Sequence, residues 1–298
     1  TLEDFALRYT PVSARRWSAK RVVMTALSAI TFLALEAIGG ALTLTYGFNY
    51  VVVAVILVSI IIFALSMPIA INAAKNGLDI DLLTRGAGFG YLGSTVTSLI
   101  YASFTFIFFA LEAAIMAMAL NMLFGLPLHF GYLIGSVVVI PLVTWGFTFI
   151  SRFQQFTQFC WLALQLLPFI FILIREHHVL QNWIDFPGFI TARDGSFDFL
   201  QLGAVCSVLL SLVSQVGEQV DQVRFLPKPQ HPARWRWYGA VIAAGPGWVV
   251  IGAIKILLGS FLAVLAFNYG LGAELASEPT HMYLVAFSYV THSSSTLL

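Results

Sequence analysis

The sequence predicts an all-α membrane protein, a bundle of long apolar helices. Hydrophobic residues make up 59% of the 298 residues and charged residues only 10%, which is more apolar surface than a water-soluble domain can cover. The apolar runs reach the length of about 20 residues that a spanning helix needs. They are too long and too uniformly apolar for the alternating strands of a membrane barrel.

Seven apolar segments are long enough to cross a bilayer, and the start of an eighth follows them. Their approximate bounds are 22–47, 50–73, 93–124, 131–150, 155–174, 200–223 and 238–267, with a further apolar stretch from about 280. A basic, amphipathic tail at 1–21 precedes this transmembrane domain at 22–298. Because the chain opens without Met and stops inside or just before a span, we expect a fragment, truncated after about seven spans.

The basic residues predict the orientation of the chain. Of the 15 Lys and Arg residues, 12 fall on the side of the N-terminus, Arg175 and Arg193 fall on the other side, and Lys255 lies in a span. Since Lys and Arg accumulate in cytoplasmic loops, we expect a multi-pass protein of the inner (cytoplasmic) membrane with its N-terminus inside. Arg234 and Arg236 alternate with Trp and are interpreted as a membrane anchor, so no nucleic-acid partner is expected.

A long loop at about 175–199 divides the spans into two blocks. The first block, at about 22–174, holds five spans. The start of the second block occupies about 200–298. This division is typical of transporters with a five-plus-five inverted repeat, in which the first and sixth spans enter from opposite sides and are both interrupted near the midplane.

Glycines and carboxylates occupy corresponding places in the first and sixth spans. The first span carries Glu36 next to Gly39, and the sixth carries Gln215, Gly217 and Glu218. Glycine weakens a helix, and nearby polar groups can satisfy the backbone that an interruption frees. We therefore expect both spans to break at these glycines and a small solute to bind between them.

Three motifs, in order and at helix-scale spacing, carry a resemblance to a known family. They are the glycine-rich loop at 77–90 with Arg85, the third span through Phe108 and Glu112, and the segment at 221–225 that ends the sixth span. Together they resemble the nucleobase–cation symporters, which are the purine and cytosine permeases. The resemblance implies the five-plus-five inverted-repeat fold of the leucine-transporter type.

The resemblance also implies roles for two residues of the third span. Phe108 stands where the family has a Trp that stacks on the nucleobase, and Glu112 stands where it has a Gln that bonds the edge of the base. A carboxylate near the bilayer centre costs about 2.5–3.5 kcal/mol on insertion scales, unless a cation pairs with it or a proton neutralises it. These departures imply a ligand other than the usual nucleobases, such as an amine, or proton coupling at Glu112.

The remaining charges within or beside the spans are expected to act as gates or as structural pairs. These residues are Arg85, Asp221, Arg224 and Lys255. Lys255 is interpreted chiefly as one half of a buried ion pair with a glutamate. Asp221 and Arg224 are expected to pair with each other or with loop groups at the cytoplasmic end of the sixth span.

Two functions fit these observations. The first is a transporter that moves a small nitrogen-containing solute, nucleobase-like or an amine, by alternating access coupled to Na⁺ or H⁺. The second is a ligand-sensing membrane input domain of a histidine kinase, because the segments at 214–227 and 278–283 resemble permease-like regions of bacterial sensor kinases. A structural membrane scaffold is a third reading. No enzymatic activity is expected of this segment, which has no P-loop, zinc-protease motif or nucleophile elbow.

Overall fold

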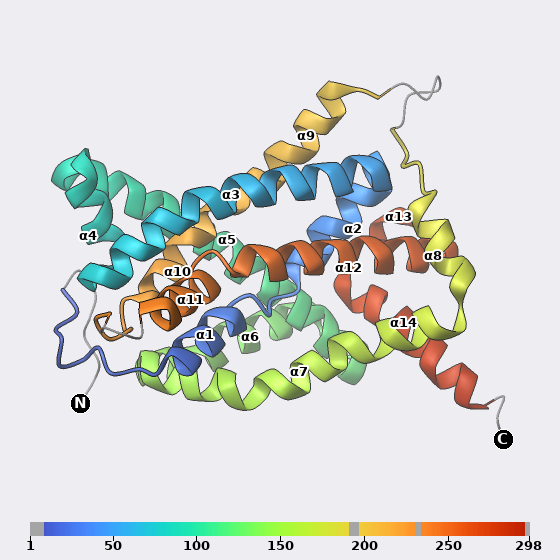
Figure 1. Ribbon diagram of the computed structural model, residues 1–298. Helices are drawn as coiled ribbons and strands as arrows, with labels where there is room; N and C mark the ends of the chain where they lie inside the picture. The colour runs from blue at the N-terminus through green and yellow to red at the C-terminus, as the bar shows by residue number, and fades with distance from the viewer. Residues whose placement is uncertain (1–8, 191–196, 230–233, 296–298) are drawn as a thin grey trace.

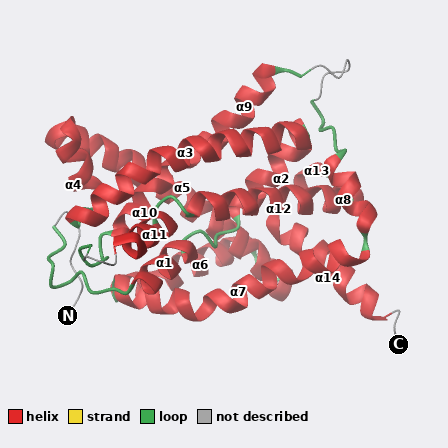
Figure 2. Ribbon diagram, in the orientation of Figure 1, coloured by secondary structure: helices red, strands yellow, loops and turns green. Residues whose placement is uncertain are grey.

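The computed structural model describes residues 9–190, 197–229 and 234–295, and the regular structure of these residues is entirely helical (Figure 2). The all-α prediction is therefore confirmed for these ranges. In chain order the elements are α1 (Ala19–Ser28), α2 (Ala34–Tyr46), α3 (Phe48–Asn76), α4 (Ile80–Thr84), the π-helical turn η1 (Arg85–Phe89), α5 (Gly90–Phe124), α6 (Leu128–Thr144), α7 (Phe147–Arg175), α8 (His177–Ile184), α9 (Phe199–Leu210), the 3₁₀ turn η2 (Ser211–Ser214), α10 (Gln215–Val223), α11 (Arg234–Ala244), α12 (Trp248–Asn268), α13 (Ala273–Ala276) and α14 (Pro279–Ser295).

Five of the seven predicted spans correspond to helices, or runs of consecutive helices, long and apolar enough to cross a membrane. Within the described residues these are Phe48–Asn76, Ile80–Phe124, Thr148–Ile174, Phe199–Val223 and Arg234–Asn268. The fourth predicted span corresponds to α6, which is apolar but shorter. The first, predicted at 22–47, is divided between α1 and α2, and each of these is too short to cross alone.

The outer helices present apolar side chains to their surroundings, as helices in lipid do. On α5 and α6, large hydrophobic residues are strongly exposed, among them Leu92, Phe106, Leu133 and Ile140. On α12, by contrast, side chains such as Phe261 are completely buried. The bundle is therefore apolar both at its surface and at its centre.

Helix α12 forms the centre of the bundle and lies between α3 and α7 (Figure 1). Its closest neighbour is α2, and glycines make this approach possible. A Cβ on Gly39 would collide with the backbone carbonyl of Ile256, and a Cβ on Gly259 would collide with the backbone of Glu36. Glycine is used at these two positions because the two backbones are almost in contact.

The first predicted span is broken, but not at its glycines. The interruption lies at 29–33, between α1 and α2, whereas Gly39 lies inside α2. Two hydroxyl groups bond the backbone at this break: Ser28 donates to the carbonyl of Met24 and Thr31 donates to that of Ser28. The prediction of a break at Gly39 is therefore wrong, because this glycine serves helix packing.

The sixth predicted span is also distorted upstream of its glycine. The 3₁₀ turn η2 separates α9 from α10, and the Ser211 hydroxyl donates to the carbonyl of Val208. Gly217 lies inside α10, where its Cα faces the ring of Tyr101 on α5. The predicted break at Gly217 is wrong for the same reason as at Gly39, since both glycines admit a close neighbour.

The last described helix runs in the same direction as α12. Gly40 is contacted both by Met282, near the start of α14, and by Ala263 of α12. One to two turns further along both helices, the ring of Tyr289 lies 6.0 Å from that of Tyr269 at the end of α12. The chain therefore returns toward the middle of the bundle after α12, and α14 begins there.

The segment before α1 is fastened across one end of the bundle. Arg15 donates from Nε to the carbonyl of Leu226 (2.9 Å) and from its terminal nitrogens to the carbonyls of Ala74 and Lys75 at the end of α3. Trp17 stacks on Phe225 at 4.7 Å. We call residues 9–17 the N-terminal strap. It joins the end of α3 to the segment that follows α10.

Candidate functional site

The break between α1 and α2 is held by two residues of α5, one helical turn apart. The ring of Phe108 packs edge-on against Phe32 in the break, with 5.2 Å between ring centroids. The backbone N–H of Ala34, at the start of α2, donates to Oε1 of Glu112 at 2.8 Å. Since the first N–H groups of a helix have no partner within it, Glu112 caps α2 from a neighbouring helix. Its negative charge also lies at the positive end of the helix dipole.

Glu36, half a turn into α2, is the centre of a buried polar cluster. Its Oε1 accepts hydrogen bonds from Nζ of Lys255 on α12 and from Nε2 of Gln165 on α7, both at 2.5 Å. Glu36 is completely buried and Lys255 is 3% exposed. Oε2 of Glu36 and the hydroxyl of Tyr283 have no hydrogen-bond partner among the described residues. The interpretation of Lys255 as part of an ion pair corresponds to this contact.

Trp161 covers the lysine of this cluster. Its indole ring lies 4.4 Å from Nζ of Lys255, on the same helix as Gln165 and one turn before it. A cation over an indole face is stabilised by about 0.5–2 kcal/mol. Lys255 is therefore neutralised by Glu36 on one side and covered by an aromatic ring on another.

A cavity of about 400 Å³ adjoins the cluster, between α5, α7 and the start of α14. It is lined by Leu33, Glu112, Ile115, Met116, Ala119, Trp161, Leu164, Gln165, Pro279, Thr280, Tyr283 and Phe287. Most of this surface is apolar, with a few polar groups at the wall nearest the cluster. An apolar pocket with a small number of convergent polar groups is the usual form of a small-molecule site.

The structure divides the predicted site residues into two groups. Glu36, Glu112 and Lys255 gather at the break of the first span, and Phe108 packs there without lining the cavity. The residues of the sixth span form the second group and do not reach this cavity. They are Gln215, Gly217 and Glu218.

The second group lies on α10, beside a part of α5 that precedes Glu112. Gln215 donates from Nε2 to Oε2 of Glu218 at 2.5 Å, and Gly217 faces Tyr101. Tyr101 precedes Glu112 by eleven residues, or about 16 Å of helix at 1.5 Å per residue. The side chains near the two predicted interruptions therefore do not form one compact site.

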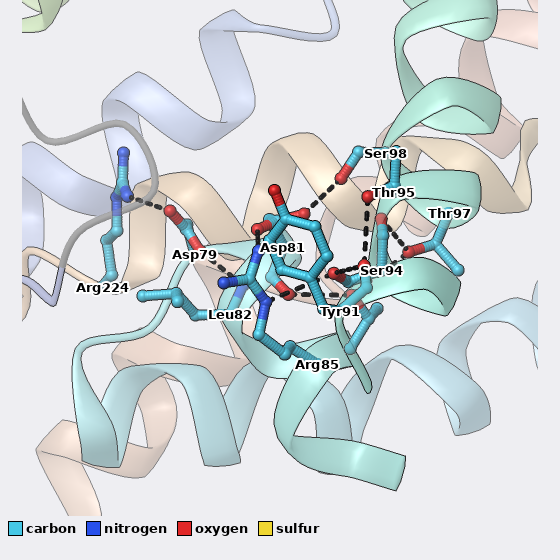
Figure 3. Close-up of polar contacts among 11 residues, drawn as sticks. Asp79, Asp81, Leu82, Arg85, Tyr91, Ser94, Thr95, Thr97, Ser98 and Arg224 are labelled. Atoms are coloured by element: carbon cyan, nitrogen blue, oxygen red, sulfur yellow. Dashed lines mark hydrogen bonds and ion pairs between the residues drawn. The ribbon is translucent and has the colours of Figure 1, made fainter. Parts of the chain in front are cut away.

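Arg85 and Arg224, two of the charges predicted to act as gates or structural pairs, lie beside α4 (Figure 3). Arg224 pairs with Asp79 at 3.4 Å, with both side chains almost fully buried. Its Nε also donates to the carbonyl of Asp221 at 3.0 Å, and Asp221 in turn accepts from the N–H of Ile80 at 3.4 Å. Arg224 therefore joins the end of α10 to the loop that follows α3.

A second ion pair orders the glycine-rich turn. Arg85 donates to Asp81 at 2.9 Å, and the other oxygen of Asp81 accepts from Ser98 on α5 at 2.5 Å (Figure 3). The guanidinium of Arg85 lies 4.9 Å from the ring centroid of Tyr91. Between Arg85 and Tyr91 the chain makes a π-helical turn in which Gly88 has φ of 108°. Residues with side chains rarely adopt this conformation. Arg85 thus fixes the loop rather than facing a ligand.

Of the residues that line the cavity, sequence reasoning singled out Glu112 and missed the rest, including three that matter for the proposed site: Trp161, Gln165 and Tyr283. A signal was available for two of them. Gln165 is a polar residue in the middle of an otherwise apolar span, and Trp161 precedes it by four residues, which places both on one helix face. Tyr283 carried no such signal, because its position depends on the return of the chain after α12.

Comparisons of the sequence with known families and with curated proteins identify no relative. No model of a known protein family matches the chain, and no curated protein shows significant similarity to it. The functional argument therefore depends on the contacts described above.

Proposed function

We propose that this chain is a membrane domain that binds a small nitrogen-containing solute in the cavity between α5, α7 and α14, as part of cation-coupled transport by alternating access. The observation that supports this proposal most directly is the position of the cavity. It lies directly beside a broken helix, and Glu112, Gln165 and Tyr283 are among the polar residues of its otherwise largely apolar wall. In this proposal these groups orient the solute, and Trp161 supplies an aromatic face for it.

The broken helices support a transporter-type architecture. Both α1–α2 and α9–α10 are interrupted, and discontinuous helices at the midplane are typical of inverted-repeat transporters. On this proposal the α4 end is cytoplasmic, the N-terminus lies inside, and the Arg224–Asp79 pair closes the cavity from the cytoplasm. Either Na⁺ or H⁺ fits as the coupling ion.

The second candidate is a ligand-sensing input domain of a histidine kinase that no longer transports. The sequence segments at 214–227 and 278–283 favour it. The second of these contains the first residues of α14, so it contributes Pro279, Thr280 and Tyr283 to the cavity. A sensor would use the same pocket and relay its occupation to a kinase domain in the same protein.

A panel of solutes tests the proposal. Purines, pyrimidines, hydantoins and amines are added to the purified, folded, full-length protein, and the thermal unfolding midpoint is measured. A ligand at 100 times its dissociation constant stabilises by about 2.7 kcal/mol, so a binding solute gives a clear shift. If no solute of the panel shifts the midpoint, the chain is a structural scaffold and the proposal is wrong. Uptake into vesicles then separates the transporter from the sensor.

A further inference from the structure

The charges around the cavity do not cancel, and this narrows the class of solute. Glu36 and Lys255 form one neutral pair. Among the residues that line the cavity, Glu112 is the charged one, and within the described part of the chain no ion pair includes it. In its ionised form, Glu112 therefore leaves one negative charge at the cavity wall.

The start of α2 offsets only part of this charge. The N–H of Ala34 donates to Oε1 of Glu112, and a helix N-terminus is equivalent to about half a positive charge. The hydrogen bond of the Lys255 ammonium goes to Glu36 and not to Glu112. A carboxylate in a largely apolar space attracts a positive partner strongly, because little water screens it.

The rest of the wall suits an organic cation better than a metal ion. Aromatic rings of Trp161, Tyr283 and Phe287 line the cavity together with aliphatic side chains. Na⁺ and other hard cations need several oxygen ligands at once, whereas an alkylated or aromatic ammonium group is held by ring faces and one carboxylate. The volume of about 400 Å³ lies within the range of small-molecule pockets.

From these observations we infer that the cavity binds a small organic monocation, an amine or quaternary ammonium compound, whose positive group meets Glu112 and whose body lies against Trp161 and Tyr283. This inference rests on the proposed function, since it names the solute class of the same cavity. A neutral nucleobase would leave the charge of Glu112 without a counter-ion, and an organic anion would be repelled by it.

The test compares solutes of the same shape and different charge on the wild-type full-length protein. The probes are choline against 3,3-dimethylbutan-1-ol, and benzylamine against benzyl alcohol and benzoate. We expect the cations to bind at least about tenfold more tightly than their neutral counterparts, which is the effect of one well-placed charge interaction. Equal affinity for the neutral compounds, or tighter binding of benzoate, overturns the inference.

The variant Glu112→Gln locates the effect. Glutamine keeps an oxygen that accepts from Ala34, so the start of α2 stays capped, while the charge is lost. We expect this variant to lose the preference for cations and to keep the affinity for neutral solutes. Glu274→Gln on α13 is the matched control, because it removes a carboxylate that does not line the cavity, and it is expected to leave cation affinity unchanged.

The outcomes of these binding experiments distinguish a failure of the inferred solute class from a failure of the proposed function. If neutral or anionic solutes bind and cations do not, the solute class is wrong and the proposed binding site stands. If Glu112→Gln leaves the preference for cations intact, the carboxylate is only a helix cap and the inference is wrong. If no probe and no solute of the wider panel binds, both the inference and the proposed function fail. The wild-type comparison decides the matter even if the variant does not fold.

Discussion

Glu36 and Lys255 place two full charges in a region that admits almost no water. Their side chains are 0% and 3% exposed, and their attraction offsets the cost of desolvation only while both are present. Gln165 adds a second hydrogen bond to the same carboxylate oxygen. The pair thus ties α2 to α12 and, through Gln165, to α7.

The variant Lys255→Met tests this residue-scale account. It leaves Glu36 as an uncompensated buried charge, so we expect a loss of about 3–5 kcal/mol in stability. The double variant Glu36→Gln with Lys255→Met removes both charges and is expected to recover most of that loss. Chemical unfolding of the purified variants measures both effects. A single variant as stable as the wild type would show that the pair contributes nothing.

Gly39 provides a second test at this scale, because its Cα lies against the backbone of Ile256. Gly39→Ala forces α2 away from α12, and we expect it to cost about 1–3 kcal/mol, as overpacking does. Gly239→Ala in α11 is the matched control. It has open space around the new Cβ, so it is expected to be neutral or slightly stabilising. Similar midpoints for the two variants in thermal unfolding would contradict the packing role of Gly39.

At the scale of elements, the sequence was a better guide to helices than to their interruptions. Length and hydropathy are properties of a whole segment, and they located the long helices. The breaks span only a few residues, and a glycine in an apolar span can instead lie inside a helix where it meets another backbone. That contact is a property of the folded bundle. Consequently the sequence predicts breaks at Gly39 and Gly217, although both glycines lie inside helices.

The N-terminal strap is an element whose role the sequence did not reveal. Arg15 is 3% exposed, and burial lowers the pKa of its guanidinium from the ordinary value of 12.5; the group stays charged at neutral pH. Its donors meet the last carbonyls of α3, which have no partner within the helix. A positive charge is also favourable at this end of a helix dipole. The strap therefore stabilises the end of α3.

We predict that Arg15→Gln loosens the end of α3. Hydrogen bonds from a charged group contribute about 1.5–3 kcal/mol, and Arg15→Lys, which lacks the planar fork, is expected to restore only part of this. Hydrogen exchange measured on the peptides around Ala74 and on those of α12 gives the readout. Exchange should rise at Ala74 and stay unchanged in α12. Unchanged exchange at both places would contradict the role of the strap.

At the scale of the whole molecule, two buried ion pairs lie in separate places. One place holds the cluster of Glu36, Lys255 and Glu112 beside the cavity, and the other holds the Arg224–Asp79 pair at the α4 end. The sequence indicated Glu36, Glu112, Lys255 and Arg224, because charges are rare in apolar spans, but it did not single out Asp79. It did not separate the two places, and it missed the wall formed by α7 and α14. Those contacts are made between segments far apart in the chain.

Site-specific labelling tests the central claim that a solute occupies this cavity. Ala119→Cys, introduced after replacement of Cys160 and Cys206, places a thiol on the cavity wall, and its reaction rate with a maleimide is measured with and without a solute that shifts the unfolding midpoint. Ser207→Cys on the exposed side of α9 is the control. We predict that the solute slows labelling at position 119 and not at position 207. A solute that binds the protein and leaves labelling at position 119 unchanged would contradict the account.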